Sequence, residues 1–337
     1  MGGVGGRPAA APRVAIATCA DRAGLYPEGV LLVEALQQQG VTAVPAIWNG
    51  DVGWDDFDAV MVRTTEDYFR TPARFLDWAR SLGTRLFNSP ETVEWNLDKH
   101  YLLDLAGHGI PVVATQYVPP GSRPEFPPGQ FVVKPTVSAG ANSTAAYDEA
   151  GQDAARRHVR ELHAAGRTVM LQPYCHRVDT EAETAVIFID GELSHCMRKE
   201  PLLRVGQPPV ESKTEDMSVH EPPADMLDLA RRAHDTVAAS LGMPLYARAD
   251  MVRDDAGRPV LIELELIEPM LFLGHAPGSA AKLAAAFVRH AGLAPRVAVP
   301  ASANGGFRLW PPSDARKCGS RSSPARLSCW PGARVSA

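Results

Sequence analysis

The stretch YARADMVRDDAGRPVLIELEL, residues 246–266, contains two runs of alternating apolar residues on either side of an Asp-Asp-Ala-Gly turn. Such alternation around a turn predicts a β-hairpin. Counting outward from the Ala-Gly bond of the turn places Asp250 opposite Glu263. The same count places Arg248 opposite Glu265. Because side chains alternate between the two faces of a strand, all four point to one face, and the hairpin gathers three carboxylates and one guanidinium in a single patch.

This patch has two interpretations. Crowded carboxylates repel one another and take up protons unless a cation lies among them. A hard divalent ion such as Mg²⁺, shared with a polyphosphate, removes the conflict, since such ions prefer oxygen ligands and are often held by only one or two protein carboxylates. Glu-Leu-Glu alternation is equally typical of a half-exposed strand whose acids face water. Segments upstream must separate the two interpretations.

Length, composition and charge exclude several classes of protein. At 337 residues the chain is longer than one core usually serves, which predicts two or three subdomains. A net charge of −5 leaves no basic footprint, so we expect no nucleic-acid partner. No apolar run approaches the ~20 residues that span a bilayer, and the first residues lack the apolar core of a secretory signal, so we expect no membrane partner. Five scattered cysteines without a Cys-x-x-Cys motif favour a reducing cytoplasm.

The first ninety residues alternate between predicted strands and helices, which predicts a parallel sheet. The strands are expected at 13–18, 41–47, 59–63 and 85–88, and the helices at 26–40 and 71–82. Ligands of such sheets bind beyond the carboxyl ends of the strands. The polar residues there that we expect to contact a small substrate are Asp21, Arg63, Asp67 and Arg70. An arginine that closes an apolar strand suits a bound carboxylate, although a surface salt bridge is an equal alternative for Arg63.

Two lysines are candidate phosphate ligands. Lys99 falls in the first turn of a predicted helix, 96–106, where the helix dipole disfavours a cation unless an anion is close; an exposed helix lysine is the alternative. Lys134 ends the buried strand FVVKP, 131–135. The loop that follows, 136–144, consists mainly of small and hydroxyl residues and would let backbone N–H groups approach phosphate oxygens. Flexible surface loops share this composition, and no Walker motif is present.

A second hairpin is predicted around the Asp-Gly turn at 190–191. Counting outward pairs Glu183 with Arg198 on one face and leaves Lys199 on the other. Glu183 could then accept ribose hydroxyls while Arg198 meets a phosphate. The alternative is a plain cross-strand ion pair, worth about 0.2 to 1 kcal/mol. Further helices are expected at 152–165, 225–241 and 279–291, and a strand at 168–171.

Taken in order, these motifs resemble those of the ATP-grasp ligases. Within that superfamily the chain looks most like the D-cycloserine synthetase (O-ureido-D-serine cyclo-ligase) branch, with glutathione synthetase more distant. The resemblance extends from about residue 13 to residue 290. It is carried by RTTEDYFR from Arg63, WNLDKHYL from Trp95, VVKPTVSAGA from Val132, LQPY from Leu171, DTEAETAVIFIDGELSHCMRK from Asp179, and YARADMV with IELELIEP.

The resemblance implies an ATP-grasp fold, α/β in class and α+β in its C-terminal part. We expect an N-terminal parallel-sheet subdomain on the substrate side (13–94), a central lid (95–171) and a catalytic subdomain with an antiparallel sheet (172–292). The Gly-, Ala- and Pro-rich leader (1–12) and the Pro-, Gly-, Ser- and Arg-rich tail (293–337) are expected to be disordered.

The resemblance also implies roles for single residues in ATP binding. Lys99 and Lys134 would hold phosphates, the 138–143 loop would close over them, residues 171–174 would receive the adenine, and Glu183 would bind the ribose. The residues implied to contact ATP are Lys99, Lys134, Ser138, Gly140, Gln172, Tyr174 and Glu183.

The implied metal ligands are Asp250, Glu263 and Glu265, for Mg²⁺ or alternatively Mn²⁺. The third ligand is more often Asn in the superfamily, so Glu265 adds a negative charge. Arg248 would stabilise the transferring phosphoryl group.

The family pattern implies one further catalytic contact to phosphate, and it leaves open whether Arg198 or Lys199 makes it. The face that Arg198 shares with Glu183 favours Arg198.

The expected function is ATP-dependent activation of a small, amino-acid-like carboxylate. An acyl phosphate would be attacked by an amine of the same molecule, as in D-cycloserine formation, with release of ADP and phosphate. One alternative is an intermolecular amino-acid or dipeptide ligase, and another is a nucleotide-binding module without catalysis. The sequence leaves open whether the protein is a monomer or a homodimer.

Overall fold

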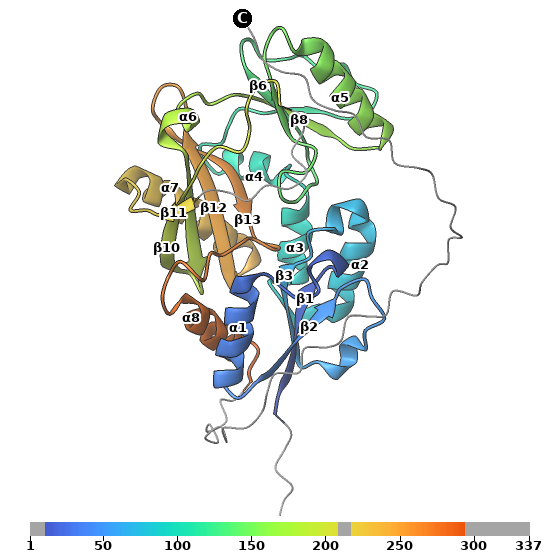
Figure 1. Ribbon diagram of the computed structural model, residues 1–337, viewed down its shortest axis with the longest axis vertical. Helices are drawn as coiled ribbons and strands as arrows, with labels where there is room; N and C mark the ends of the chain where they lie inside the picture. Colours follow the sequence, from blue (N-terminus) through green and yellow to red (C-terminus); the bar gives the residue numbers. More distant parts are fainter. Residues whose placement is uncertain (1–10, 208–216, 294–337) are drawn as a thin grey trace, which may run out of the picture. The chain divides into compact units, whose positions relative to one another are not determined.

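The structure is a computed structural model that describes residues 11–207 and 217–293, and these residues form three β-sheets (Figure 1). Most of the predicted leader and tail, residues 1–10 and 294–337, lie outside this part of the chain. The mixed α/β architecture, with one parallel and two antiparallel sheets, confirms the predicted fold class. Among the described helices, none is long and apolar enough to cross a membrane.

The N-terminal sheet is parallel, with the strand order β2-β1-β3-β4. Its strands are β1 (Arg13–Thr18), β2 (Thr42–Ile47), β3 (Ala59–Thr64) and β4 (Leu86–Phe87), and its main helices are α1 (Pro27–Gln38) and α2 (Pro72–Leu82). Every residue of β3 is buried, as expected for a parallel strand whose two faces are both covered. The elements predicted for these residues are confirmed to within two residues at each end.

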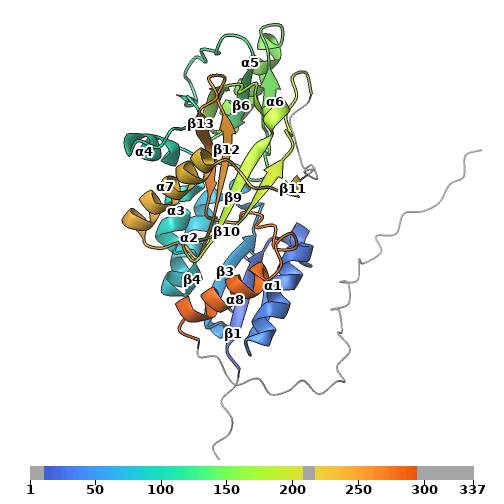
Figure 2. The same ribbon diagram turned by 90° about the vertical axis from the view of Figure 1, so that its left-hand side faces the viewer.

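The central sheet is antiparallel and has the order β11-β10-β9-β12-β13. Its strands are β9 (Glu183–Ile189), β10 (Glu192–Lys199), β11 (Met217–Val219), β12 (Tyr246–Arg253) and β13 (Pro259–Glu265). Helix α7 (Ala224–Leu241) covers one face, and α8 (Ser279–His290) returns to pack beside α1 (Figure 2). Both predicted hairpins are therefore present and adjacent, through β9 and β12.

The third sheet, predicted as the lid, has the order β5-β8-β6-β7 and is antiparallel. Its strands are β5 (Gln116–Val118), β6 (Phe131–Pro135), β7 (Ala145–Tyr147) and β8 (Val169–Pro173). Helix α5 (Gln152–Ala164) packs its apolar side chains on this sheet. The short helices are α6 (Val178–Glu181) and the 3₁₀ turns η1 (Ala20–Arg22), η2 (Trp54–Asp56), η3 (Tyr68–Arg70) and η4 (Gly83–Arg85).

The single helix predicted over residues 96–106 is wrong. The chain forms α3 (Pro90–Leu97) and α4 (Tyr101–Gly107), separated by three residues. Helix α3 begins at a Ser89 cap followed by proline at the first helical position. In the break, the Lys99 backbone N–H donates to Thr136 O at 3.0 Å, which ties the break to the end of β6. The helix-dipole argument for Lys99 therefore does not apply, and tertiary contacts set its position.

Candidate functional site

A cleft of about 1150 Å³ is lined by residues from all three sheets and from the loops that follow their strands. Large concave sites of this kind are the usual place for small-molecule binding. The predicted site residues that line it are Asp21, Arg63, Asp67, Arg70, Lys99, Lys134, Ser138, Gly140, Gln172, Tyr174, Glu183, Lys199, Arg248, Asp250, Glu263 and Glu265. Arg198 does not line it. The fold thus brings together residues that lie up to 244 positions apart, between Asp21 and Glu265.

The β12–β13 hairpin has the predicted pairs at the acidic patch, Arg248 with Glu265 and Asp250 with Glu263. Closer to the turn the register differs by one residue, since Met251 pairs with Leu261. The turn is therefore centred on Ala256 rather than on the Ala-Gly bond, and one extra residue in β13 restores the predicted pairing. The extra residue is Ile262, which forms a β-bulge.

The bulge decides which face carries the acids. In an unbulged strand Asp250 would lie opposite Ile262, Glu263 would point to the core face together with Leu261, and Leu264 would turn to the cleft. With the bulge, Ile262 and Glu263 both face the cleft, while Leu261 and Leu264 stay in the core beneath α7. Bulges next to functional sites commonly redirect a side chain in this way.

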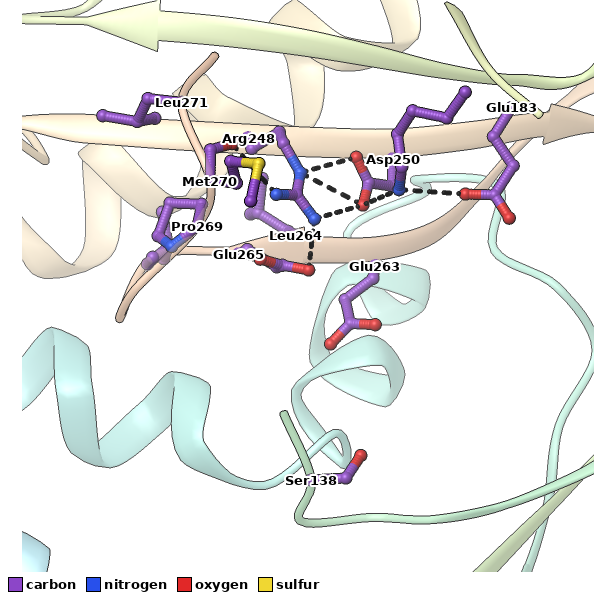
Figure 3. A network of polar contacts seen from close by, with 12 residues as sticks. Ser138, Glu183, Arg248, Asp250, Glu263, Leu264, Glu265, Pro269, Met270 and Leu271 are labelled. Carbon is purple, nitrogen blue, oxygen red and sulfur yellow. Dashed lines mark hydrogen bonds and ion pairs between the residues drawn. The ribbon is translucent and has the colours of Figure 1, made fainter. Parts of the chain in front are cut away.

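Arg248 is the centre of the polar network in the cleft (Figure 3). Its Nε donates to Asp250 Oδ1 at 2.9 Å and its Nη2 to Asp250 Oδ2 at 2.8 Å. Nη2 also donates to Glu265 Oε1 at 2.5 Å, and Nη1 to the Met270 carbonyl at 3.0 Å. Lys199 Nζ bridges Asp250 and Glu183 at 3.2 Å each. Cation and acid thus alternate across the floor of the cleft.

These pairings set the ionisation of the acids. Burial opposes ionisation of Asp250, but Arg248 and Lys199 lower its pKa to about 2. Burial likewise opposes ionisation of Glu263, and Lys99, at 3.1 Å from its Oε1, lowers its pKa. Burial raises the pKa of Glu265 to about 7 despite Arg248. Two of the three acids, Asp250 and Glu263, are therefore anionic at neutral pH.

The acids supply hard oxygen donors, which suits Mg²⁺, but they do not form a complete metal site by themselves. Within residues 11–207 and 217–293, no three His, Cys, Asp or Glu side chains are grouped to hold a metal ion. Mg²⁺ typically keeps several non-protein ligands and is held by one or two carboxylates together with phosphate oxygens. The donor set therefore fits a metal that arrives with a polyphosphate.

Two buried lysines face these acids from the side of the third sheet. Lys99 is 4% exposed and its Nζ donates to Ser138 O at 3.1 Å as well as pairing with Glu263. Lys134 is 7% exposed, and burial lowers its pKa. In the part of the chain that the structure describes, its amine has neither a hydrogen bond nor an ion pair with another side chain. A buried cation without such a partner calls for an anionic ligand.

The predicted face of Arg198 is wrong. A bulge in β10 between Leu193 and His195 shifts the register, so that Glu183 pairs with Lys199 and Arg198 pairs with Thr184. Arg198 instead forms an ion pair with Glu200 at 3.2 Å. Lys199 is the residue that shares the cleft with Glu183.

The nucleotide end predicted from the sequence is bordered by an apolar slot that the sequence did not reveal. Tyr174 is buried in it, and Gln172 lies at its edge with its amide bonded to Thr115 Oγ1 at 2.8 Å. The other apolar side chains that line the slot are Val113, Val132, Val178, Leu203, Val252 and Ile262. Strand alternation could have placed Val132 in the slot, because it lies on the face opposite to the core residue Val133. Ile262 faces the slot only because of the bulge in β13.

The substrate end lies beyond the carboxyl end of β3. Asp67 accepts from Trp48 Nε1 at 2.6 Å, while Asp21 and Arg70 are exposed to the cleft. Arg63 is not a surface residue, since it is 2% exposed and pairs with Glu28 at 2.6 Å.

Glu268 also lines this end of the cleft and was missed from the sequence. Burial, with Glu265 and Glu66 nearby, raises its pKa well above the usual range. It follows the last strand of the hairpin, so no strand periodicity could have placed it.

Comparison with known proteins gives consistent relatives. Residues 14–88 match the family model of the N-terminal domain of D-cycloserine synthetase DcsG. The cycloserine biosynthesis protein DcsG of Streptomyces lavendulae is 36% identical over 287 residues, which cover 76% of this chain and 91% of the relative. The crystal structure of D-cycloserine synthetase DcsG matches with a TM-score of 0.74 and 33% identity, over 83% of this chain and 99% of the other. An ATP complex of the D-alanine–D-alanine ligase of Bacillus anthracis shares the fold, with a TM-score of 0.59 and 16% identity over 83% and 97% of the two chains.

Proposed function

Because the chain belongs to the D-cycloserine synthetase family of ATP-grasp ligases, and is thus an ATP-dependent carbon–nitrogen ligase, we propose that it activates the carboxylate of a small amino-acid-like substrate as an acyl phosphate. An amine then displaces phosphate. By similarity to the family, the amine belongs to the same molecule and the product is cyclic. The observation that carries the proposal is the cleft itself, because an apolar slot, two buried lysines and the hairpin acids all line it.

The nucleotide is oriented by three kinds of contact. The apolar slot beside Tyr174 takes the adenine, and Glu183 accepts from the ribose hydroxyls. Lys134 and Lys99 then meet the phosphates. In this arrangement the buried amine of Lys134 gains an anionic partner, which offsets the cost of burying its charge. A bound Mg²⁺, held by Asp250 and Glu263, would neutralise charge on the phosphate oxygens.

Arg248 acts on the phosphoryl group during transfer. A carboxylate oxygen of the substrate attacks the γ-phosphorus and ADP leaves, and the amine nitrogen then attacks the acyl carbon and inorganic phosphate leaves. Such a reaction needs positioning and charge neutralisation rather than a protein nucleophile. The guanidinium of Arg248, fixed on three sides by Asp250, Glu265 and the Met270 carbonyl, is preorganised to stabilise the equatorial oxygens.

Trapping of the acyl phosphate tests this function. The protein is incubated with ATP, Mg²⁺, hydroxylamine and a panel of amino acids and their O-substituted derivatives. We expect a hydroxamate together with substrate-dependent ADP release, and the hydroxamate identifies the activated acid. Without hydroxylamine, a product with the mass of one substrate molecule less one water marks cyclisation, whereas a product with the mass of two molecules less one water marks an intermolecular ligase. ADP release that no acid stimulates would contradict the proposal.

The corrected register of β10 leads to a matched pair of variants. Lys199→Met is expected to lower turnover at least tenfold, because the amine that bridges Asp250 and Glu183 in the cleft is lost. Arg198→Met is expected to change turnover less than threefold, because Arg198 lies outside the cleft. Steady-state ADP release under saturating substrates compares the two. The reverse order of effects would show that Arg198 is the phosphate contact.

A further inference from the structure

The segment of residues 269–273, which follows the β12–β13 hairpin, is bonded to side chains from three different parts of the fold. Three successive carbonyls accept from arginine or histidine side chains (Figure 3 labels the three carbonyl-bearing residues). Arg63 Nη2 donates to Pro269 O at 2.8 Å, Arg248 Nη1 to Met270 O at 3.0 Å, and His195 Nε2 to Leu271 O at 2.9 Å. The carbonyl that orients Arg248 therefore lies between two other anchored carbonyls.

Glu28, at the start of α1, holds the same segment by its amides. Its Oε1 accepts from the Leu271 N–H at 3.3 Å and from Arg63 at 2.6 Å, and its Oε2 accepts from the Leu273 N–H at 3.4 Å. The Arg63 and Glu28 side chains are only 1% and 10% exposed. A pair from α1 and β3 thus holds a segment that follows the β12–β13 hairpin.

This pair is better suited to positioning than to stability. Replacing a buried ion pair by apolar residues is often neutral or stabilising, because the desolvation of two charges offsets their attraction. Direct substrate contact is also a poor fit for Arg63, since its Nη2 is committed to the pair. Its Nε and Nη1 are sealed from solvent and find no hydrogen-bond partner in the described part of the chain.

We propose that Arg63 and Glu28 are positioning residues that hold the 269–273 segment so that the Met270 carbonyl aims Arg248 at the reacting phosphoryl group. This inference rests on the proposed function. Small displacements of a catalytic group of about 1 Å can cost about 10²-fold in rate. The pair therefore acts on kcat through Arg248, without contacting the substrate.

The test removes the pair without leaving a buried charge. In Glu28→Leu/Arg63→Met, we expect a thermal midpoint within a few degrees of the parent, a kcat for hydroxamate formation lowered at least tenfold, and KM values for ATP and the acid changed less than threefold. The matched control is Glu94→Leu/Arg80→Met, which removes an ion pair of 2.7 Å between half-exposed side chains of the same subdomain. The control should keep its kcat. Arg63→Lys, which retains the charge but not the fork geometry, supplies the same comparison if the double variant folds poorly.

Coupling to Arg248 separates positioning from general destabilisation. In the Arg248→Lys background, removal of the pair should lower kcat by less than threefold further, because residues that act as one unit are not additive. A full tenfold loss in that background, or an unchanged kcat in the parent background, overturns the proposal. A raised KM for the acid with unchanged kcat would instead make Arg63 a substrate ligand and also overturn it.

Hydrogen exchange tests, without any turnover, whether the Arg63–Glu28 pair holds the 269–273 segment. Peptides that cover residues 269–273 should exchange at least tenfold faster in Glu28→Leu/Arg63→Met than in the parent or the control. Unchanged exchange overturns the inference whatever the reaction proves to be. Absence of hydroxamate from the parent, with every acid tested, would instead refute the proposed function, so the two failures are distinguishable.

Discussion

Replacing Arg248 by lysine is expected to lower the rate of acyl-phosphate formation by about 10²- to 10³-fold, in the range found when one preorganised donor to a transition state is lost. Lysine keeps the positive charge beside Asp250 and Glu265, so the acids are not left uncompensated. It loses the planar fork with which Arg248 binds Asp250, Glu265 and the Met270 carbonyl together. Single-turnover hydroxamate formation at saturating ATP measures the effect on the chemical step.

The control for this variant is Arg258→Lys in the same hairpin. Arg258 pairs with Asp254 beside the turn, and its side chain is 77% exposed. We expect the control to keep the parental rate and thermal midpoint. An Arg248→Lys protein that turns over within threefold of the parent would show that Arg248 does not act on the phosphoryl group.

Replacing Lys134 by methionine is expected to abolish most activity and to stabilise the protein. The KM for ATP should rise at least tenfold, because the buried amine that meets phosphate is lost. The thermal midpoint should rise by about 2 °C, which corresponds to about 1 kcal/mol in a protein of this size, because the folded state no longer buries that charge. Burial lowers the pKa of Lys134, so this gain is fully present below the folded pKa. It shrinks as the pH rises through the folded pKa, where the parental lysine loses its proton.

Lys282→Met provides the control for Lys134→Met, since Lys282 is exposed on α8. Its activity, KM for ATP and thermal midpoint should match those of the parent. Calorimetry and ADP release on both variants decide the matter. A destabilised Lys134→Met protein would mean that the lysine serves the fold, and an unchanged KM for ATP would remove it from the phosphate site.

The sequence predicted the parallel N-terminal sheet and both hairpins because local signals determine them. Apolar runs, helix caps and the Asp-Gly turn are read within a few residues, and β1, α2 and β12 lie close to where they were expected. The strand ends and the resemblance together predicted site residues that all line one cleft, Arg198 excepted. They could not reveal Glu28, because a carboxylate whose partners lie 35 and 243 residues away along the chain carries no local signal.

Strand register and the direction of single side chains were decided by the tertiary structure. Two bulges, in β10 and β13, each insert one residue between a turn and the cleft. The bulge in β13 places Glu263 opposite Asp250. The bulge in β10 pairs Glu183 with Lys199, where the sequence predicted a pair with Arg198. By itself the sequence determined most of the strands and helices, the split of the 96–106 helix into α3 and α4 excepted, and the chemistry that they carry. Packing determined which face the residues beyond each bulge occupy. A shift of one residue reverses the face of a side chain, and core contacts between segments far apart in the sequence decide which register is stable.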